Sequence, residues 1–182
     1  MKKLLYANDQ SESLATLIKL RIPILVVGLI FGIGISYITS NFEKVLSQNI
    51  QIAFFLPFIV YIADAVGTQT ETIYARNLKS NNAKFSKYIW KELILGLIVG
   101  LIFGFFSSLV ILLWIHNFLL AISVGLASCV AIAVAPPVAL IVTQSFQNAR
   151  KDPAVSSGPI TTVLQDMLSV LIYGVIATLI IL

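Results

Sequence analysis

The sequence has 182 residues, of which 58% are hydrophobic and only 11% carry a charged side chain. A soluble domain of this size could not cover so much apolar surface, so the composition predicts an integral membrane protein. One cysteine, Cys129, excludes a disulfide framework or a thiolate metal cluster, and one histidine, His116, excludes a site built from several histidines. The net charge of +4 falls in loops, which in a membrane protein indicates topology rather than binding to nucleic acid.

The first 21 residues form a short polar lead before the first long apolar run. Leu14, Leu17 and Ile18 alternate with charged positions, a pattern that fits a helix lying in the membrane interface. Lys2 and Lys3 are followed by polar residues rather than by an apolar core, which excludes a signal peptide. We expect a cytoplasmic lead over residues 1–21, with no room for a soluble regulatory domain, and a transmembrane domain over residues 22–182.

Five apolar stretches follow, each about as long as the 20 residues that a helix needs to cross a bilayer. They predict an all-α polytopic membrane protein with short connections. Residues 41–49 read as a polar loop, and His116 with Asn117 as a tight turn. Residues 76–91 read as a basic linker leading into the next helix, with Tyr88 and Trp90 as headgroup anchors. The predicted spans cover approximately residues 22–38, 50–73, 93–115, 118–142 and 160–182.

Small residues recur every four positions in two spans, the spacing that lets two helices approach closely. Gly28 and Gly32 share this spacing in the first span, where a helix that merely contains glycine explains them equally well. Pro136 and Pro137 interrupt the hydrogen-bond ladder of the fourth span and predict a kink or a break. The two stripes are Gly96, Gly100, Gly104 and Ser108 in the third span, and Ala121, Gly125, Cys129 and Ala133 in the fourth.

The distribution of Lys and Arg predicts the orientation. The lead, the loop over residues 76–91 and the loop with Arg150 and Lys151 together carry eleven basic residues, whereas the opposite side has only Lys44. Positive loops remain in the cytoplasm. We therefore expect a multi-pass protein of the plasma membrane with its N-terminus in the cytoplasm and its C-terminus outside.

The second predicted span begins with apolar residues and continues as a helix into a polar segment. Asp64 and Glu71 are seven residues apart, so they lie near one face of a helix, with Thr68 between them. Carboxylates within a transmembrane helix are costly and usually face a partner or a water-filled path. The alternative is that the helix leaves the membrane at Asp64, but the apolar run over residues 50–62 is then too short to span.

The fifth span contains a second polar face. Pro159 suits the first turn of a helix. Thr162 and Asp166 are one turn apart, and Ser169 and Tyr173 continue the same face. Asp166 is thus predicted to look inward from a second helix, inside the hydrocarbon region.

Two motifs carry a resemblance to a known family. GTQT at Gly67–Thr70, combined with DPAVSSGPITTVLQD at Asp152–Asp166, resembles the membrane domain of the MgtE family of magnesium channels and transporters. The five spans and the predicted orientation agree, and the resemblance covers nearly the whole chain. It implies a homodimer of five-helix domains whose ion path lies between the two copies, lined by the second and fifth helices. It further implies that Asp166 selects the ion and that Ala63, Asp64 and Ala65 line the path.

The sequence departs from the family pattern in three respects. Acidic and apolar residues, Asp64 and Val66 among them, precede GTQT where the family usually has glycines and an asparagine. Glu71 is an additional acid, so the path is expected to be more negative than usual. The cytoplasmic N and CBS domains that gate bacterial members have no counterpart in these residues, so that form of gating is not expected within this polypeptide.

The side chains of both polar faces offer oxygen only, which suits Mg²⁺, a hard cation that keeps much of its water. We therefore predict transport of a divalent cation, Mg²⁺ above others, by a protein surrounded by membrane lipid that is not an enzyme. The expected ion ligands are Asp166, Asp64, Glu71, Thr162 and Thr68, and the other path-lining residues are Ala63, Ala65, Gly67, Thr72 and Ser169.

Three other interpretations are weighed against this one. A carrier could use the same carboxylates as proton relays. An intramembrane aspartyl protease would pair Asp64 with Asp166, but the Gly-x-Gly-Asp motif of those enzymes is missing. A non-transporting membrane subunit would pair its acids with Lys or Arg, and no basic residue lies inside a predicted span.

Overall fold

The computed structural model describes residues 12–80, 83–149 and 153–182, and within them the regular structure is helical. Five of the helices are long and apolar enough to cross a membrane, which confirms the predicted all-α polytopic class. The helices are α1 (Leu14–Ser40), α2 (Glu43–Gln48), α3 (Gln51–Lys79), α4 (Phe85–Ile115), α5 (Phe118–Asn148) and α6 (Pro153–Ile181).

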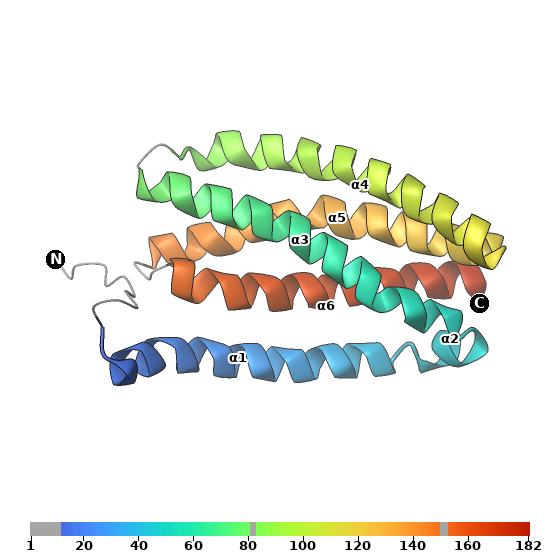
Figure 1. Ribbon diagram of the computed structural model, residues 1–182, viewed down its shortest axis with the longest axis horizontal. Helices are drawn as coiled ribbons and strands as arrows, with labels where there is room; N and C mark the ends of the chain where they lie inside the picture. Colours follow the sequence, from blue (N-terminus) through green and yellow to red (C-terminus); the bar gives the residue numbers. More distant parts are fainter. Residues whose placement is uncertain (1–11, 81–82, 150–152) are drawn as a thin grey trace.

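The long helices form a bundle with α5 at its centre (Figure 1). Helix α5 packs against α3, α4 and α6, while α3 crosses the bundle diagonally and also contacts α6. Helix α1 lies on the far side of α6 and has no buried residue. The side chains of α1 therefore remain available to lipid or protein, whereas α5 is held on several sides.

The interface between α4 and α5 is built from the two predicted stripes of small residues. A Cβ atom placed on Gly100 would lie 2.5 Å from the carbonyl oxygen of Cys129, and one on Gly104 would lie 2.6 Å from that of Gly125. The Ser108 hydroxyl donates a 2.8 Å hydrogen bond to the carbonyl oxygen of Ala121. The backbones touch because glycine leaves no side chain between them, which confirms the packing prediction.

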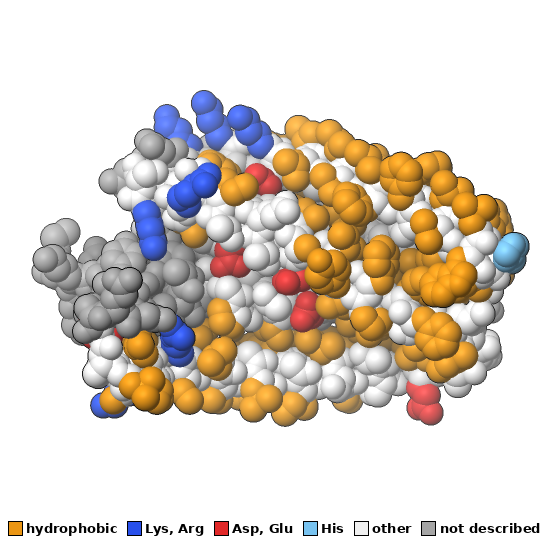
Figure 2. All heavy atoms as spheres, viewed as in Figure 1, with side chains coloured by type: hydrophobic (Ala, Val, Ile, Leu, Met, Phe, Trp, Pro, Cys, Tyr) orange, Lys and Arg blue, Asp and Glu red, His pale blue; other side chains and the backbone are white. Residues whose placement is uncertain are grey.

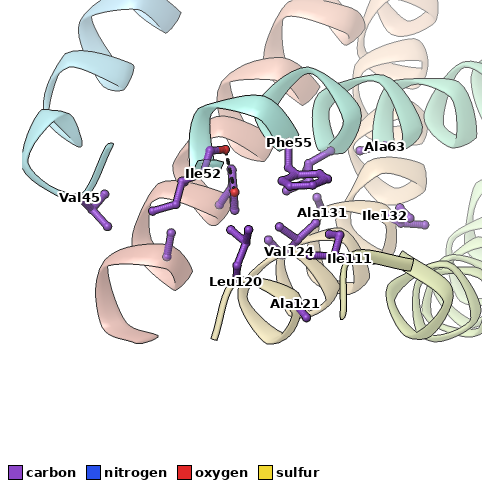
Figure 3. Close-up of a cluster of buried hydrophobic side chains, with 14 of the residues drawn as sticks. Val45, Ile52, Phe55, Ala63, Ile111, Leu120, Ala121, Val124, Ala131 and Ile132 are labelled. Atoms are coloured by element: carbon purple, nitrogen blue, oxygen red, sulfur yellow. Dashed lines mark hydrogen bonds between the residues drawn. The ribbon is translucent and has the colours of Figure 1, made fainter. Parts of the chain in front are cut away.

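The apolar core fills the end of the bundle where α3 and α5 begin and α6 ends (Figures 1 and 3). Ile52 and Phe55 of α3 meet Leu120 and Val124 of α5, and all four side chains are buried. The Tyr173 hydroxyl of α6 donates a 2.8 Å hydrogen bond to the carbonyl oxygen of Ile52. This half of the bundle is thus a packed apolar core, and the polar residues lie toward the other end.

The connections differ from the sequence prediction in one place and agree in another. The segment over residues 41–49, predicted as a loop, contains the helix α2, because Val45 folds inward and is 1% exposed. The tight turn at His116 is confirmed, with a left-handed φ of 58°, and the Asn117 side chain caps α5 by accepting from the Leu120 amide.

Of the two outcomes predicted at Pro136 and Pro137, a kink or a break, the break is ruled out, because α5 continues through both residues to Asn148. Inside a membrane bundle the carbonyls that lose their helical donors can be satisfied locally, and unfolding the backbone would expose more of them. Pro136 is buried and its ring faces Gly96 of α4, where an added Cβ would lie 3.1 Å away. The proline pair therefore helps to form the α4–α5 contact.

Several helices extend beyond their apolar runs. Helix α1 begins at Leu14 and passes without interruption through the expected boundary between residues 21 and 22, with Pro23 inside it. Residues 1–11 of the predicted lead lie outside the described residues. Helix α3 continues to Lys79 and α4 begins at Phe85, so most of the basic segment over residues 76–91 is helical. A Cβ atom placed on Gly28 or Gly32 would meet nothing within 4 Å, so their spacing serves no close helix contact within the described part of the chain.

Candidate functional site

The three carboxylates singled out in the sequence lie on two adjacent helices. Asp64 and Glu71 are on α3, Asp166 is on α6, and the two helices pack against one another. The Thr162 hydroxyl of α6 is within hydrogen-bonding reach of the Asp64 carboxylate. Asp64 is also close enough to both other acids for their charges to repel. The acids predicted from separate spans therefore form one electrostatic group.

Glu71 is the most enclosed of the three and is fixed to α6. Its side chain is 9% exposed, and its Oε1 atom accepts a 2.6 Å hydrogen bond from the Ser157 hydroxyl. Gly158 lies beside it, since a Cβ placed there would be 3.8 Å from the same oxygen. The sequence prediction did not include Ser157, although it belongs to the long motif that carries Asp166.

A groove of about 480 Å³ opens between α3 and α6 at this level. Thr68 and Thr72 are exposed and line this groove. Two cations of α3, Arg76 and Lys79, lie at its basic end. Figure 2 shows acidic side chains gathered in a mostly non-hydrophobic part of the surface, between orange apolar areas and the blue basic end. The groove is lined by Thr68, Glu71, Thr72, Ala75, Arg76, Lys79, Gly158 and Thr162.

Three residues predicted to line the path are buried inside the bundle instead. Ala63 is 0% exposed, Ser169 is 2% exposed, and Gly67 packs against Gln165 of α6. On α3 the buried stripe runs through Ala63, Gly67, Thr70 and Tyr74, while Asp64, Thr68 and Thr72 follow on the neighbouring stripe. Adjacent residues of a helix point about 100° apart, so the small residues pack inside the bundle while Thr68 and Thr72 face the groove. Ala65 and Asp166 are partly exposed.

Polar residues that the sequence prediction omitted complete the interior. Gln165, 2% exposed, covers Gly67 and donates a 3.0 Å hydrogen bond from Nε2 to the carbonyl oxygen of Ala135. Thr70 donates a 2.7 Å hydrogen bond to the Glu92 carboxylate of α4. Gln165 directly precedes Asp166 in the motif, so its position could have indicated that it belongs to the site. Nothing in the local pattern pairs Glu92 with Thr70, because they come from different helices.

The arrangement offers oxygen ligands spread along a helix pair. Among residues 12–80, 83–149 and 153–182 no three His, Cys, Asp or Glu side chains are close enough to hold one metal ion together. Atom Oδ1 of Asp64 has no hydrogen-bond partner within the described part of the chain, although it is buried. A carboxylate oxygen left in this way can accept a hydrogen bond from water or contact a cation.

The comparison with known proteins agrees with this geometry. The family model MgtE, described as a divalent cation transporter, matches residues 56–176, which include both polar faces. The magnesium transporter MgtE of Enterococcus faecalis is 33% identical over 87% of the chain, and the protein of the same name from Bacillus subtilis is 30% identical over 87%. That of Thermus thermophilus is 27% identical over 87%. The chain spans 36% of the length of each of these relatives. The chain belongs to the MgtE family of divalent cation transporters.

Proposed function

We propose that this protein carries divalent cations, Mg²⁺ above others, across the membrane along the face formed by α3 and α6. The observation that carries the proposal is the group formed by Asp64, Glu71 and Asp166 on two adjacent membrane-spanning helices. Within the described residues none of these acids is ion-paired with a Lys or Arg side chain. Acids in such a position need water, a cation or a shared proton as a companion.

The choice of ion follows from the ligands. The groove and the residues beside it offer carboxylates and threonine hydroxyls, and Cys129, the single cysteine, lies on α5 toward α4. Mg²⁺ prefers oxygen, retains several waters and is commonly held by one or two carboxylates. Acids that are separated rather than clustered suit an ion that passes with its water still bound. The relatives named magnesium transporters support the same ion.

A second copy of the chain completes the path in this proposal. The groove is open at the surface of one bundle, so a single chain cannot enclose a hydrated ion. Two copies related by a two-fold axis would bring two Asp166 and two Asp64 side chains around that axis. Crosslinking and native mass measurement in mild detergent should therefore give dimers. Monomers alone under conditions that support transport would contradict the two-fold arrangement.

The side chains divide into three roles. Asp166 supplies the charge that selects a divalent ion, and Asp64, with Thr162 and Thr68, contacts the ion or its water. Glu71, held by Ser157, sets the potential of the groove from a fixed position. Ala65 and Thr72 line the path, whereas the buried residues Ala63, Gly67 and Ser169 shape it by packing.

The orientation proposed from the basic residues places the C-terminal ends of α3 and α6 on opposite sides of the membrane. The C-terminal end of α3, with Arg76 and Lys79, faces the cytoplasm, and the C-terminal end of α6 faces the outside of the plasma membrane. The groove then opens toward the cytoplasm. Accessibility of a cysteine introduced near each end, in a variant with Cys129 replaced by Ala, tests this orientation from either side of sealed cells.

A proton-coupled carrier is the second candidate, because Asp64 and Asp166 lie near enough for their charges to interact, and carboxylates within membrane-spanning helices can relay protons. The two candidates differ in one measurable quantity. A channel moves Mg²⁺ down its gradient without proton movement, whereas a carrier exchanges or co-transports protons in step with the ion.

The deciding experiment is ion flux into liposomes that contain the purified protein, with Mg²⁺, Mn²⁺, Co²⁺, Zn²⁺ and Ca²⁺ compared and internal pH recorded. We expect saturable Mg²⁺ entry that exceeds that of protein-free liposomes. The matched control variant is Glu43→Gln, since Glu43 is an exposed acid on α2 remote from the groove. No divalent flux above background from a folded dimer would leave a non-transporting subunit as the better reading.

A further inference from the structure

We propose that a crevice between the end of α3 and the start of α4 binds the phosphate headgroup of an anionic phospholipid. The crevice has a volume of about 440 Å³. It lies at the basic end of the bundle, where blue side chains gather in Figure 2 near the link between α3 and α4. It is lined by Ile73, Lys84, Lys87, Tyr88, Lys91 and Glu92.

The crevice concentrates positive charge. Lys87 and Lys91 are four residues apart in the first turns of α4, so they share one face of the helix, and Lys84, the N-cap residue, borders the same crevice. All three side chains are exposed. None of them forms an ion pair with another residue in the described part of the chain. Three lysines against one glutamate, Glu92, leave a net charge of +2. This is the charge expected of a site for a phosphate group.

The walls of the crevice are fixed by contacts between α3 and α4. The Glu92 carboxylate accepts the 2.7 Å hydrogen bond from Thr70, which holds it toward α3. The Tyr88 phenol accepts a hydrogen bond from the Asn77 side-chain amide, and its ring packs against Tyr74 with centroids 4.9 Å apart. Lys87 and Lys91 therefore project from a helix whose position against α3 is fixed by these contacts.

The surroundings select a lipid over a free anion. Immediately beyond the crevice, α4 presents Trp90, Leu93, Ile94 and Leu97 to the outside, with exposed fractions of 67%, 42%, 57% and 51%. This apolar strip belongs to a helix long enough to cross the membrane, so it borders acyl chains. Lysine heads reach the headgroup level while their stems lie along apolar surface. Basic pockets between transmembrane helices bind anionic headgroups in this way.

This site is separate from the proposed ion path. The groove between α3 and α6 is lined by other residues, among them Thr68 and Thr72, and the crevice uses Ile73 on the neighbouring side of α3. A bound lipid would connect α3 to α4 without entering the groove. The inference therefore does not depend on transport.

The test measures lipid binding to the purified full-length chain by native mass spectrometry. Phosphatidylglycerol is compared with phosphatidylcholine of the same acyl chains, and we expect the anionic lipid to bind at least tenfold more tightly. The double variant Lys87→Gln with Lys91→Gln should weaken phosphatidylglycerol binding by about fivefold for each lysine. The matched control is Lys19→Gln with Lys44→Gln, which removes two exposed lysines outside the crevice and should leave binding unchanged.

Three results would overturn the proposal. Equal loss in both double variants would mean that the lipid responds to net charge alone. Equal binding of the two lipids would remove the headgroup as the ligand. Displacement of phosphatidylglycerol by inorganic phosphate at similar concentration would identify a site for a free anion instead. Thermal unfolding in phosphatidylcholine nanodiscs checks that both double variants are folded.

Discussion

The α4–α5 and α3–α6 interfaces are made in opposite ways within one bundle. Between α4 and α5 small residues let the backbones approach closely, and the backbone oxygen of Cys129 lies 2.5 Å from where a Gly100 Cβ would stand. Between α3 and α6 the side chains are polar, and the Ser157 hydroxyl reaches the Glu71 carboxyl group at 2.6 Å. Both pairs belong to helices that can cross a membrane.

This difference between the two interfaces distinguishes residues that stabilise the fold from residues that are available to bind an ion. In lipid the hydrophobic effect does not drive helices together, so close backbone contact and hydrogen bonds must do so. The α4–α5 stripe provides that contact at no electrostatic cost. The acids of α3 and α6 add repulsion instead, and a stable bundle has no need of them. Adding side chains to the first interface should therefore destabilise the fold, whereas neutralising the acids of the second should alter function and leave the protein folded.

The largest effect on function is expected from Asp166→Asn, which keeps the shape of the side chain and removes its charge. Losing a charge–ion contact of about 2 kcal/mol corresponds to about thirtyfold weaker selection of a divalent ion. We expect Mg²⁺ flux into liposomes to fall by that factor or more and monovalent ions to compete. Asp166→Glu should retain part of the flux, because the charge is kept.

The contrast with α4–α5 requires that Asp166→Asn still insert and dimerise with an unchanged melting temperature. If the variant conducts Mg²⁺ like the parent with the same selectivity, the proposed path is wrong. The family membership would then describe the fold of this chain but not its ion path.

The largest effect on stability is expected from Gly100→Ala. The new Cβ would meet a backbone oxygen, which cannot rotate away, so we expect destabilisation near the upper end of overpacking costs, about 3 kcal/mol. Gly32→Ala is the matched control, since nothing lies within 4 Å of that position and alanine is the better helix former. Thermal unfolding in detergent should separate the two. Equal melting temperatures would show that the α4–α5 contact is not close.

Much of the first interface was predictable from the sequence, because glycine and alanine at intervals of four residues have few other uses in a membrane helix. Gly28 and Gly32 show the limit of that argument, since the same spacing meets no neighbour here. The pattern indicates only that another helix can approach closely at these positions. Which stripe finds a partner depends on the packing of the whole bundle.

For the α3–α6 interface, the sequence predicted which acids take part, but not which neighbouring residues are buried and which are exposed. A seven-residue spacing puts Asp64 and Glu71 near one face, yet it cannot tell a buried stripe from a neighbouring exposed one. For that reason the sequence did not predict that Ala63 and Gly67 are buried inside the bundle. It also missed Gln165, which covers Gly67, although Gln165 directly precedes Asp166. The hydrogen bond from Thr70 to Glu92 joins two helices and has no local signal.

A smaller effect on function distinguishes the two acids of α3. Asp64→Asn removes a partly exposed charge that has an unsatisfied oxygen, whereas Glu71→Gln changes a buried group already bonded to Ser157. We expect Asp64→Asn to weaken apparent Mg²⁺ affinity by about fivefold, corresponding to about 1 kcal/mol, and Glu71→Gln by less. Concentration dependence of flux measures both. Negligible effects of both variants would mean that these acids only mark the polar end of α3.

Smaller effects on stability are expected from the loss of one hydrogen bond in each interface. Ser108→Ala removes a bond to a backbone carbonyl that remains inside a helix, so its cost should be near the average of about 0.6 kcal/mol for membrane proteins. Ser157→Ala removes a donor from the enclosed Glu71 carboxyl group, and bonds to charged groups contribute about 1.5–3 kcal/mol. Unfolding measured in the same detergent should therefore show Ser157→Ala as the more destabilised variant, and replacing Glu71 by Gln in that background should recover part of the loss. If Ser108→Ala costs as much and the second change recovers nothing, the hydroxyl of Ser157 only fills space between α3 and α6.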